Sequence, residues 1–152
     1  MHLDLVRFLL GDYTLICTSA VEAELGKENP TNLKLKTLIA QGGIHRQSPR
    51  TEKVKLYGHG ERAALNLALE KRLLLLIDDW RPYEMARAFG IETVNTVTYL
   101  ASLLARALLP EDQVLQALGT LVRRGTIRAE WISAGLAMVA EIRQRRRKEK
   151  LP

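Results

Sequence analysis

A run of five apolar residues followed by two acids is the feature that most constrains the fold of this chain. Residues 73–77 read Leu-Leu-Leu-Leu-Ile, and Asp78 and Asp79 come directly after them. An uninterrupted apolar run of this length is typical of a strand buried on both faces inside a parallel sheet. Ligand sites in open α/β sheets lie outside the carboxyl ends of the strands. The sequence therefore predicts an α/β fold with two acids at the ligand-binding edge.

The pattern along the rest of the chain supports this fold class. The expected strands lie at residues 13–18, 44–46, 73–77 and 91–94, and the expected helices at 3–10, 20–25, 31–39, 61–71, 82–89 and from 96 onward. Strands that alternate with helices are typical of a parallel sheet with helices on both faces. We therefore predict a three-layer α/β/α sandwich.

Composition places the chain among cytoplasmic globular proteins. Its 152 residues, 47% of them apolar, suffice for one domain with a hydrophobic core. The longest apolar run is far shorter than the ~20 residues that a membrane span needs. Asp4 and Arg7 interrupt the apolar start, which is unlike a signal peptide. Cys17 is the single cysteine, which excludes an intramolecular disulfide and fits a reducing compartment.

The net charge of +6 is concentrated at the C-terminal end. We expect one domain over residues 1–142 and a basic tail over residues 143–152. Such a run can hold phosphate backbones by charge, which makes Arg145, Arg146 and Arg147 candidate nucleic-acid contacts. It also fits a solvated helix end, where cations suit the helix dipole.

Acids near three predicted helix starts suggest a metal site. Glu24, Glu61 and the pair Asp78-Asp79 would repel one another if gathered, unless a cation offset their charge. Mg²⁺ and Mn²⁺ prefer oxygen ligands, and such ions can activate water and clamp a phosphodiester. Acids also favour the first turns of helices without any ligand, so this pattern alone leaves both interpretations open.

Trp80 and Arg81, which follow the acidic pair, can each have either a nucleic-acid-binding role or an ordinary structural one. Trp80 can stack on a nucleic-acid base or pack the turn between strand and helix. Arg81 can contact a phosphate or face solvent.

Three segments resemble the PIN-domain nucleases, especially a toxin-like prokaryotic subgroup of predicted nucleic-acid-binding proteins. They are LICTSAVEAEL at 15–25, YGHGERAALNLALEKRLLLLIDDWRPYEMARAFGIETVNTVTYL at 57–100, and RALLPEDQVLQALGTLVRRGTIRAEWISAGL at 106–136. The middle segment is the specific one, because it matches the Gly-x-Gly-Glu helix, the Leu-rich strand and the Asp-Asp pair without gaps.

The resemblance implies a Mg²⁺- or Mn²⁺-dependent endoribonuclease, of the kind found in toxin–antitoxin pairs. By this likeness Glu24 and Glu61 match acids of the family, and the last family acid falls on Asp78 or Asp79, with Asp79 the closer match. Glu24, Glu61 and Asp79 would then be catalytic, with Asp78 as a further candidate metal ligand, and Arg81 would help to hold the RNA. The implied partners are RNA, an antitoxin protein and a second copy of the chain.

One departure from the family pattern concerns the first strand. The family opens with a strand that ends in a metal-binding Asp, and nothing here matches it. Either the start given lies too far downstream, or this protein has lost the strand, which would leave edges of two apolar strands uncovered. We expect metal affinity and activity to fall unless the missing Asp is supplied or dispensable. The alternative is a catalytically impaired PIN-like module that binds nucleic acid or protein.

Overall fold

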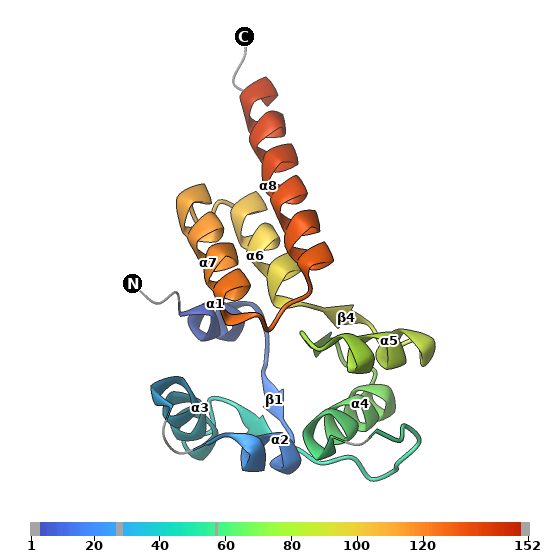
Figure 1. Cartoon of the computed structure of the whole chain (residues 1–152). Coiled ribbons are helices and arrows are strands. Elements are labelled where there is room, and N and C mark those ends of the chain that lie inside the picture. Colours follow the sequence, from blue (N-terminus) through green and yellow to red (C-terminus); the bar gives the residue numbers. More distant parts are fainter. Residues whose placement is uncertain (1–3, 27–28, 57, 150–152) are drawn as a thin grey trace. The chain divides into compact units, whose positions relative to one another are not determined.

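The computed structural model describes residues 4–26, 29–56 and 58–149. In chain order the elements are α1 Leu5–Asp12, β1 Ile16–Cys17, α2 Ser19–Glu24, α3 Pro30–Ala40, β2 His45–Arg46, α4 His59–Lys71, β3 Leu75–Leu76, α5 Trp80–Ala88, β4 Thr93–Val94, α6 Thr96–Ala105, α7 Glu111–Arg124 and α8 Ala129–Glu149 (Figure 1). This order is the one that the sequence predicts, and the α/β fold class is confirmed.

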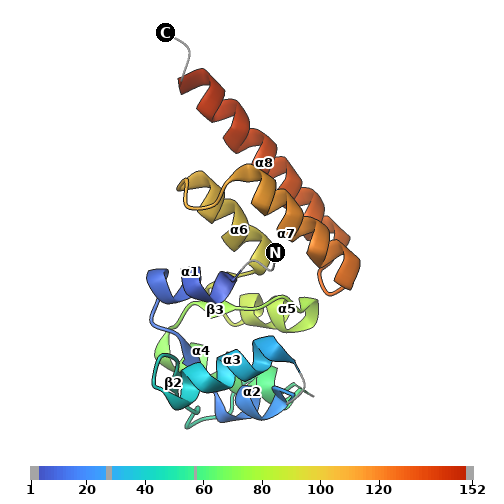
Figure 2. The same ribbon diagram turned by 90° about the vertical axis from the view of Figure 1, so that its left-hand side faces the viewer.

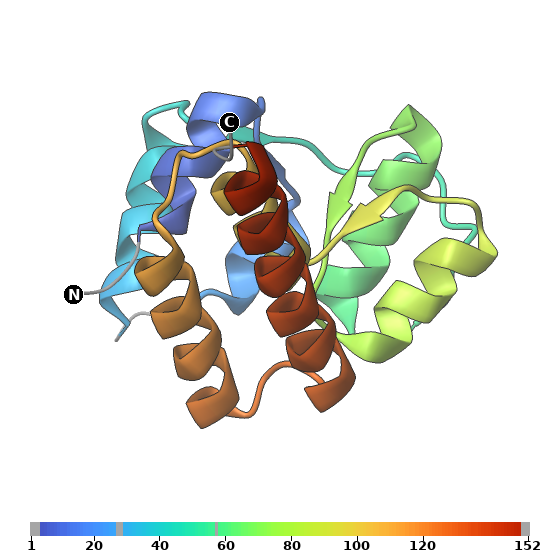
Figure 3. The ribbon, with the colours of Figure 1, turned by 90° about the horizontal axis from the view of Figure 1, so that it is seen from above.

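The strands pair in parallel, as predicted, but they are short. Ile16 of β1 lies opposite His45 of β2. Between β3 and β4, Leu75 N–H donates to the Glu92 carbonyl and Ile77 N–H donates to the Val94 carbonyl, both at 2.9 Å. These bonds advance in the same direction along β3 and β4, as in a parallel ladder, and Figure 3 shows the two arrows side by side. Within the described ranges, the strands form two separate two-stranded sheets.

The chain divides into two compact units, and each is described by itself. Unit 1 comprises Met1–Leu75 and Glu84–Glu92, and unit 2 comprises Leu76–Tyr83 and Thr93–Pro152. Residues 1–3, where the first helix is predicted to start, and residues 150–152 of the predicted basic tail lie outside the described residues. Residues 143–149 continue helix α8.

Unit 1 is organised around α4. Leu65 of α4 and Val54 of the preceding connection are fully buried. The buried Asn66 side chain accepts from the N–H groups of Lys53 at 2.7 Å and Val54 at 2.8 Å, and it donates to the carbonyls of Val54 and Arg62 at 2.9 Å. Asn66 thus ties the connection to α4, which packs against α2, and both helices are labelled in Figure 2.

Unit 2 is a bundle of α6, α7 and α8, with α8 continuing past the other two helices (Figure 1). Leu100, Leu103 and Leu104 of α6 are buried in it. Gly135 of α8 lies so close to Val97 of α6 that a β-carbon there would overlap the valine. The helices of this bundle therefore approach closely because position 135 has no side chain.

The prediction that residues 73–77 are buried on both faces is wrong for one face. Leu75 and Ile77 are each only 9% exposed, whereas Leu74 and Leu76 are 40% and 44% exposed. Successive side chains of a strand point to opposite faces, and only the face of Leu75 and Ile77 is covered.

Candidate functional site

The carboxylate of Glu24 lies at the N-terminal turn of α4. Glu24 is the last residue of α2, which packs against α4, and its Oε1 accepts a hydrogen bond from Gly60 N–H at 2.8 Å. The first N–H groups of a helix have no partner within the helix, and the positive end of the helix dipole attracts a carboxylate. This bond therefore fixes Glu24 against the second residue of α4.

Two glycines make room for carboxylates at this turn. A methyl group placed on Gly60 would lie 2.7 Å from Cδ of Glu24 and 2.8 Å from its Oε1. One placed on Gly58 would lie 2.8 Å from Cδ of Glu61. The spacing Gly-x-Gly-Glu thus has a physical reason, because side chains at positions 58 and 60 would displace the acids. Glu24 and Glu61 therefore lie at the same helix end, one against Gly60 and the other against Gly58.

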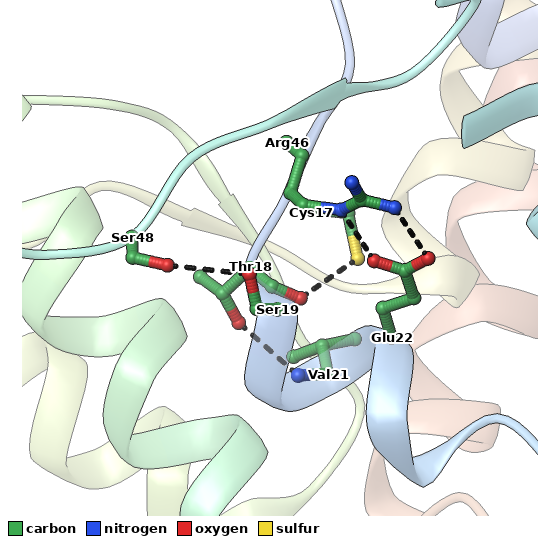
Figure 4. A network of polar contacts seen from close by, with 7 residues as sticks. All are labelled: Cys17, Thr18, Ser19, Val21, Glu22, Arg46 and Ser48. Carbon is green, nitrogen blue, oxygen red and sulfur yellow. Dashed lines mark hydrogen bonds and ion pairs between the residues drawn. The ribbon is translucent and has the colours of Figure 1, made fainter. Parts of the chain in front are cut away.

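The other acid on α2 has a different partner. Arg46 of β2 donates to both carboxylate oxygens of Glu22, at 2.6 and 2.7 Å, and this hydrogen-bonded ion pair holds the pKa of Glu22 below its usual value (Figure 4). Thr18 caps α2, since its side chain accepts from Val21 N–H at 3.2 Å. Glu22 and Thr18 fix α2 in place, and Glu24 at its end reaches α4.

Cys17, which precedes this cap, is a partly buried thiol. Its Sγ donates to the Thr18 carbonyl at 3.4 Å (Figure 4). Burial raises the pKa of the Cys17 thiol, which disfavours the nucleophilic thiolate.

The Asp pair after β3 lies in unit 2, and its two members differ in their surroundings. Asp78 Oδ1 accepts from Thr96 N–H at 2.8 Å and Asp78 Oδ2 accepts from the Thr96 hydroxyl at 2.7 Å. Asp78 therefore fixes the start of α6. Asp79 is exposed, and its carboxylate has no hydrogen-bond or ion-pair partner among residues 4–26, 29–56 and 58–149.

The structure does not itself assemble a metal centre from the predicted acids. In the part of the chain that it describes, no three His, Cys, Asp or Glu residues group closely enough to hold an ion. Glu24 and Glu61 both lie at the start of α4 in unit 1, while Asp78 and Asp79 belong to unit 2.

Of the three candidate basic contacts on α8, two bind other groups of the protein and one faces solvent. Arg145 pairs with Glu141 one turn earlier, at 2.7 Å. Arg146 donates to the carbonyl of Leu104, in the last turn of α6. Arg147 is exposed, and within the described ranges it has no ion-pair partner. The tail is therefore partly engaged in holding α8, and Arg147 is the member most available to a ligand.

A cluster of aromatic rings in unit 2 is the feature that sequence reasoning missed. The ring of Trp80 stacks on Tyr83, with centroids 5.7 Å apart and planes 24° apart. Trp131 of α8 meets both rings edge-on, at 5.8 and 4.9 Å. The guanidinium of Arg128 lies over Trp80, 4.3 Å from the ring centroid. The i, i+3 spacing of Trp80 and Tyr83 is a local signal, but nothing local connects them to Trp131.

Comparison with known proteins assigns the family. A family model described as a PIN domain matches residues 1–139. The chain belongs to the PIN-domain family. PIN domains are a nuclease-type family that binds nucleic acid and generally depends on divalent metal ions. No curated protein and no solved structure matches the chain. None of the helices in the described part of the chain has the length and apolar character that a membrane span requires.

Proposed function

We propose that this PIN domain is a metal-dependent endoribonuclease in which Glu24, Glu61 and Asp79 hold Mg²⁺ or Mn²⁺. The observation that supports it most is the paired-glycine turn at the start of α4, where the carboxylate of Glu24 lies against Gly60 and that of Glu61 against Gly58. A helix N-terminus leaves several N–H groups without a partner in the helix, and Glu24 accepts from one of them, that of Gly60. Two carboxylates at one turn offer the oxygen ligands that a hard divalent cation prefers.

The residues at this turn fit a hard divalent ion. Carboxylate oxygens are the ligands that Mg²⁺ and Mn²⁺ prefer, and a cation would offset the repulsion between Glu24 and Glu61. When bound, the ion would polarise the scissile phosphate and activate a water molecule. Assigning Asp79 to the same ion rests on the family resemblance, together with its exposure.

The remaining candidate residues take supporting roles in this proposal. Asp78 acts as a positioning residue, because both its oxygens already bind Thr96. Arg81, which is exposed, and Arg147 attract the RNA backbone. A toxin role with an antitoxin partner, assembly as a homodimer and a cytoplasmic location follow from the resemblance and composition alone.

The experiment is RNA cleavage by the purified full chain in Mn²⁺, in Mg²⁺ and in EDTA. We expect cleavage with a divalent ion, none in EDTA, and loss of cleavage in Glu61→Gln and Asp79→Asn. Glu84→Gln is the matched control, because Glu84 is an exposed acid on α5 outside the candidate site. The proposal would be overturned if the chain cleaved RNA with neither Mn²⁺ nor Mg²⁺, or if Glu61→Gln cleaved RNA as fast as the wild type. Retained RNA binding without cleavage would instead support the impaired binding module.

A further inference from the structure

The aromatic cluster of unit 2, formed by Trp80, Tyr83 and Trp131, differs from the packed core around it. None of the three rings is fully buried, whereas Leu100 and Leu103 of the same unit are. These rings keep part of their surface in contact with solvent.

The position of Arg128 shows what the Trp80 ring can accept. The Arg128 side chain is exposed and forms an ion pair with Glu130 at 3.2 Å, yet its planar guanidinium lies over the indole 4.3 Å from the ring centroid. A planar group carried by an exposed side chain therefore reaches the face of Trp80 at stacking distance. A nucleobase is a planar group of similar thickness, and base–aromatic stacking is the common way in which proteins bind single strands.

Two arginines near the cluster suit a polyanion. Arg128 lies on the Trp80 ring, and the exposed Arg81 is the next residue along α5. Asp79, the exposed acid of the candidate site, directly precedes Trp80. A base held on Trp80 would therefore be bound by the residue next to Asp79 in the chain.

We propose that Trp80 binds one unpaired base of an RNA strand, in the place that the Arg128 guanidinium now occupies, and that Arg128 then contacts the adjoining phosphate. Tyr83 and Trp131 hold the Trp80 ring in orientation. This inference deepens the proposed function and rests on it, since it assigns Trp80 as a base-binding residue for the RNA of that proposal.

Intrinsic fluorescence can test the proposal directly. The chain has two tryptophans, Trp80 and Trp131, and both belong to the cluster. We would titrate the full chain in EDTA, where metal-dependent cleavage is stopped, with short oligouridylate. An abasic ribose–phosphate oligomer of equal length and a blunt RNA duplex are the matched probes. We expect saturable quenching by oligouridylate and much weaker binding of both control probes.

Variants separate stacking from charge. Trp80→Leu should weaken oligouridylate binding about tenfold, the lower part of the range for one stacked base, whereas Trp80→Phe keeps a flat ring and most of the affinity. Arg128→Gln should lower the slope of log affinity against log salt by about 0.7, as expected for one lost phosphate contact on a single strand. Circular dichroism checks the fold, and if Trp80→Leu does not fold, the comparison of oligouridylate with the abasic oligomer on the wild-type chain decides the proposal.

The outcomes distinguish this inference from the proposed function. If oligouridylate quenches the fluorescence but the chain cleaves no RNA, the stacking proposal is supported and the proposed nuclease activity is overturned. If cleavage depends on Glu61 but oligouridylate causes no quenching, the nuclease proposal is supported and the stacking proposal is overturned. Equal binding of the abasic oligomer and oligouridylate, or unchanged binding by Trp80→Leu with an intact fold, would overturn the stacking proposal.

Discussion

Gly60→Ala is the change that most sharply separates a metal-binding role of Glu24 from a purely structural one. The added methyl would lie 2.7 Å from Cδ of Glu24 and 2.8 Å from its Oε1, well inside van der Waals contact. The carboxylate, at the end of a flexible and exposed side chain, must therefore turn away. The hydrogen bond from Gly60 N–H, now 2.8 Å long, is lost with it.

The cost in stability is small because two effects oppose each other. A hydrogen bond to a charged group contributes about 1.5–3 kcal/mol, and the lower end applies at an exposed helix end that water can reach. Alanine in a helix gains about 0.5–1 kcal/mol over glycine. The net loss is then about 1 kcal/mol, which for a chain of this size lowers the unfolding midpoint by about 2–4 °C.

The effect on metal binding should be larger than this small loss of stability suggests. We expect weaker Mn²⁺ binding by calorimetry in Gly60→Ala, with a near-native unfolding midpoint. Gly11→Ala is the control: Gly11 lies in α1, and nothing lies within 4 Å of a methyl placed there. It should gain about 0.5–1 kcal/mol in stability and bind Mn²⁺ as before. Unchanged Mn²⁺ binding in Gly60→Ala would refute the reasoning.

Three further changes test the packing and the electrostatics. Gly135→Ala should cost about 1–3 kcal/mol in a denaturant titration, because its methyl meets the packed side chain of Val97 instead of a mobile one; a stabilised variant would contradict the close helix contact. Asn66→Ala should cost about 3 kcal/mol in the same assay, since it leaves buried backbone groups unpaired; a loss near zero would mean that water replaces the side chain. Arg46 lowers the pKa of Glu22 from its ordinary value of 4.5, so their pairing stabilises the fold above about pH 4.5, and this contribution is lost as the pH falls through the lowered pKa. Glu22→Gln should therefore flatten the acid side of the midpoint-against-pH curve, and an identical acid side would count against the pair.

The order of the elements could be predicted because its signals are local. Apolar spacing, glycines at helix ends and the acids after residue 77 are all visible within a few residues of sequence. The same locality explains the errors. Five consecutive apolar residues look equally buried, and only the covered face of β3 separates Leu75 from the exposed Leu74 and Leu76.

The candidate site also depends on partners that local sequence signals do not show. Asp78 and Asp79 are chemically identical neighbours, and they differ because Thr96, on another element, bonds only the first. Likewise the role of Gly60 is clear only once Glu24 of α2 is seen against it. Partners that lie far along the chain leave no periodic signal, which is also why Trp131 was not linked to Trp80.

The most direct test of the metal-site account is the rate of RNA cleavage as a function of Mn²⁺ concentration, for the wild type, Glu24→Gln and Glu61→Gln. The glutamine at position 24 keeps an oxygen acceptor for Gly60 N–H but loses the charge, so the fold is retained while the ion is bound less tightly. We expect both variants to need more Mn²⁺ for half-maximal rate, or to show no cleavage at all. Cleavage curves that coincide with that of the wild type would contradict the assignment of these two carboxylates to a metal ion.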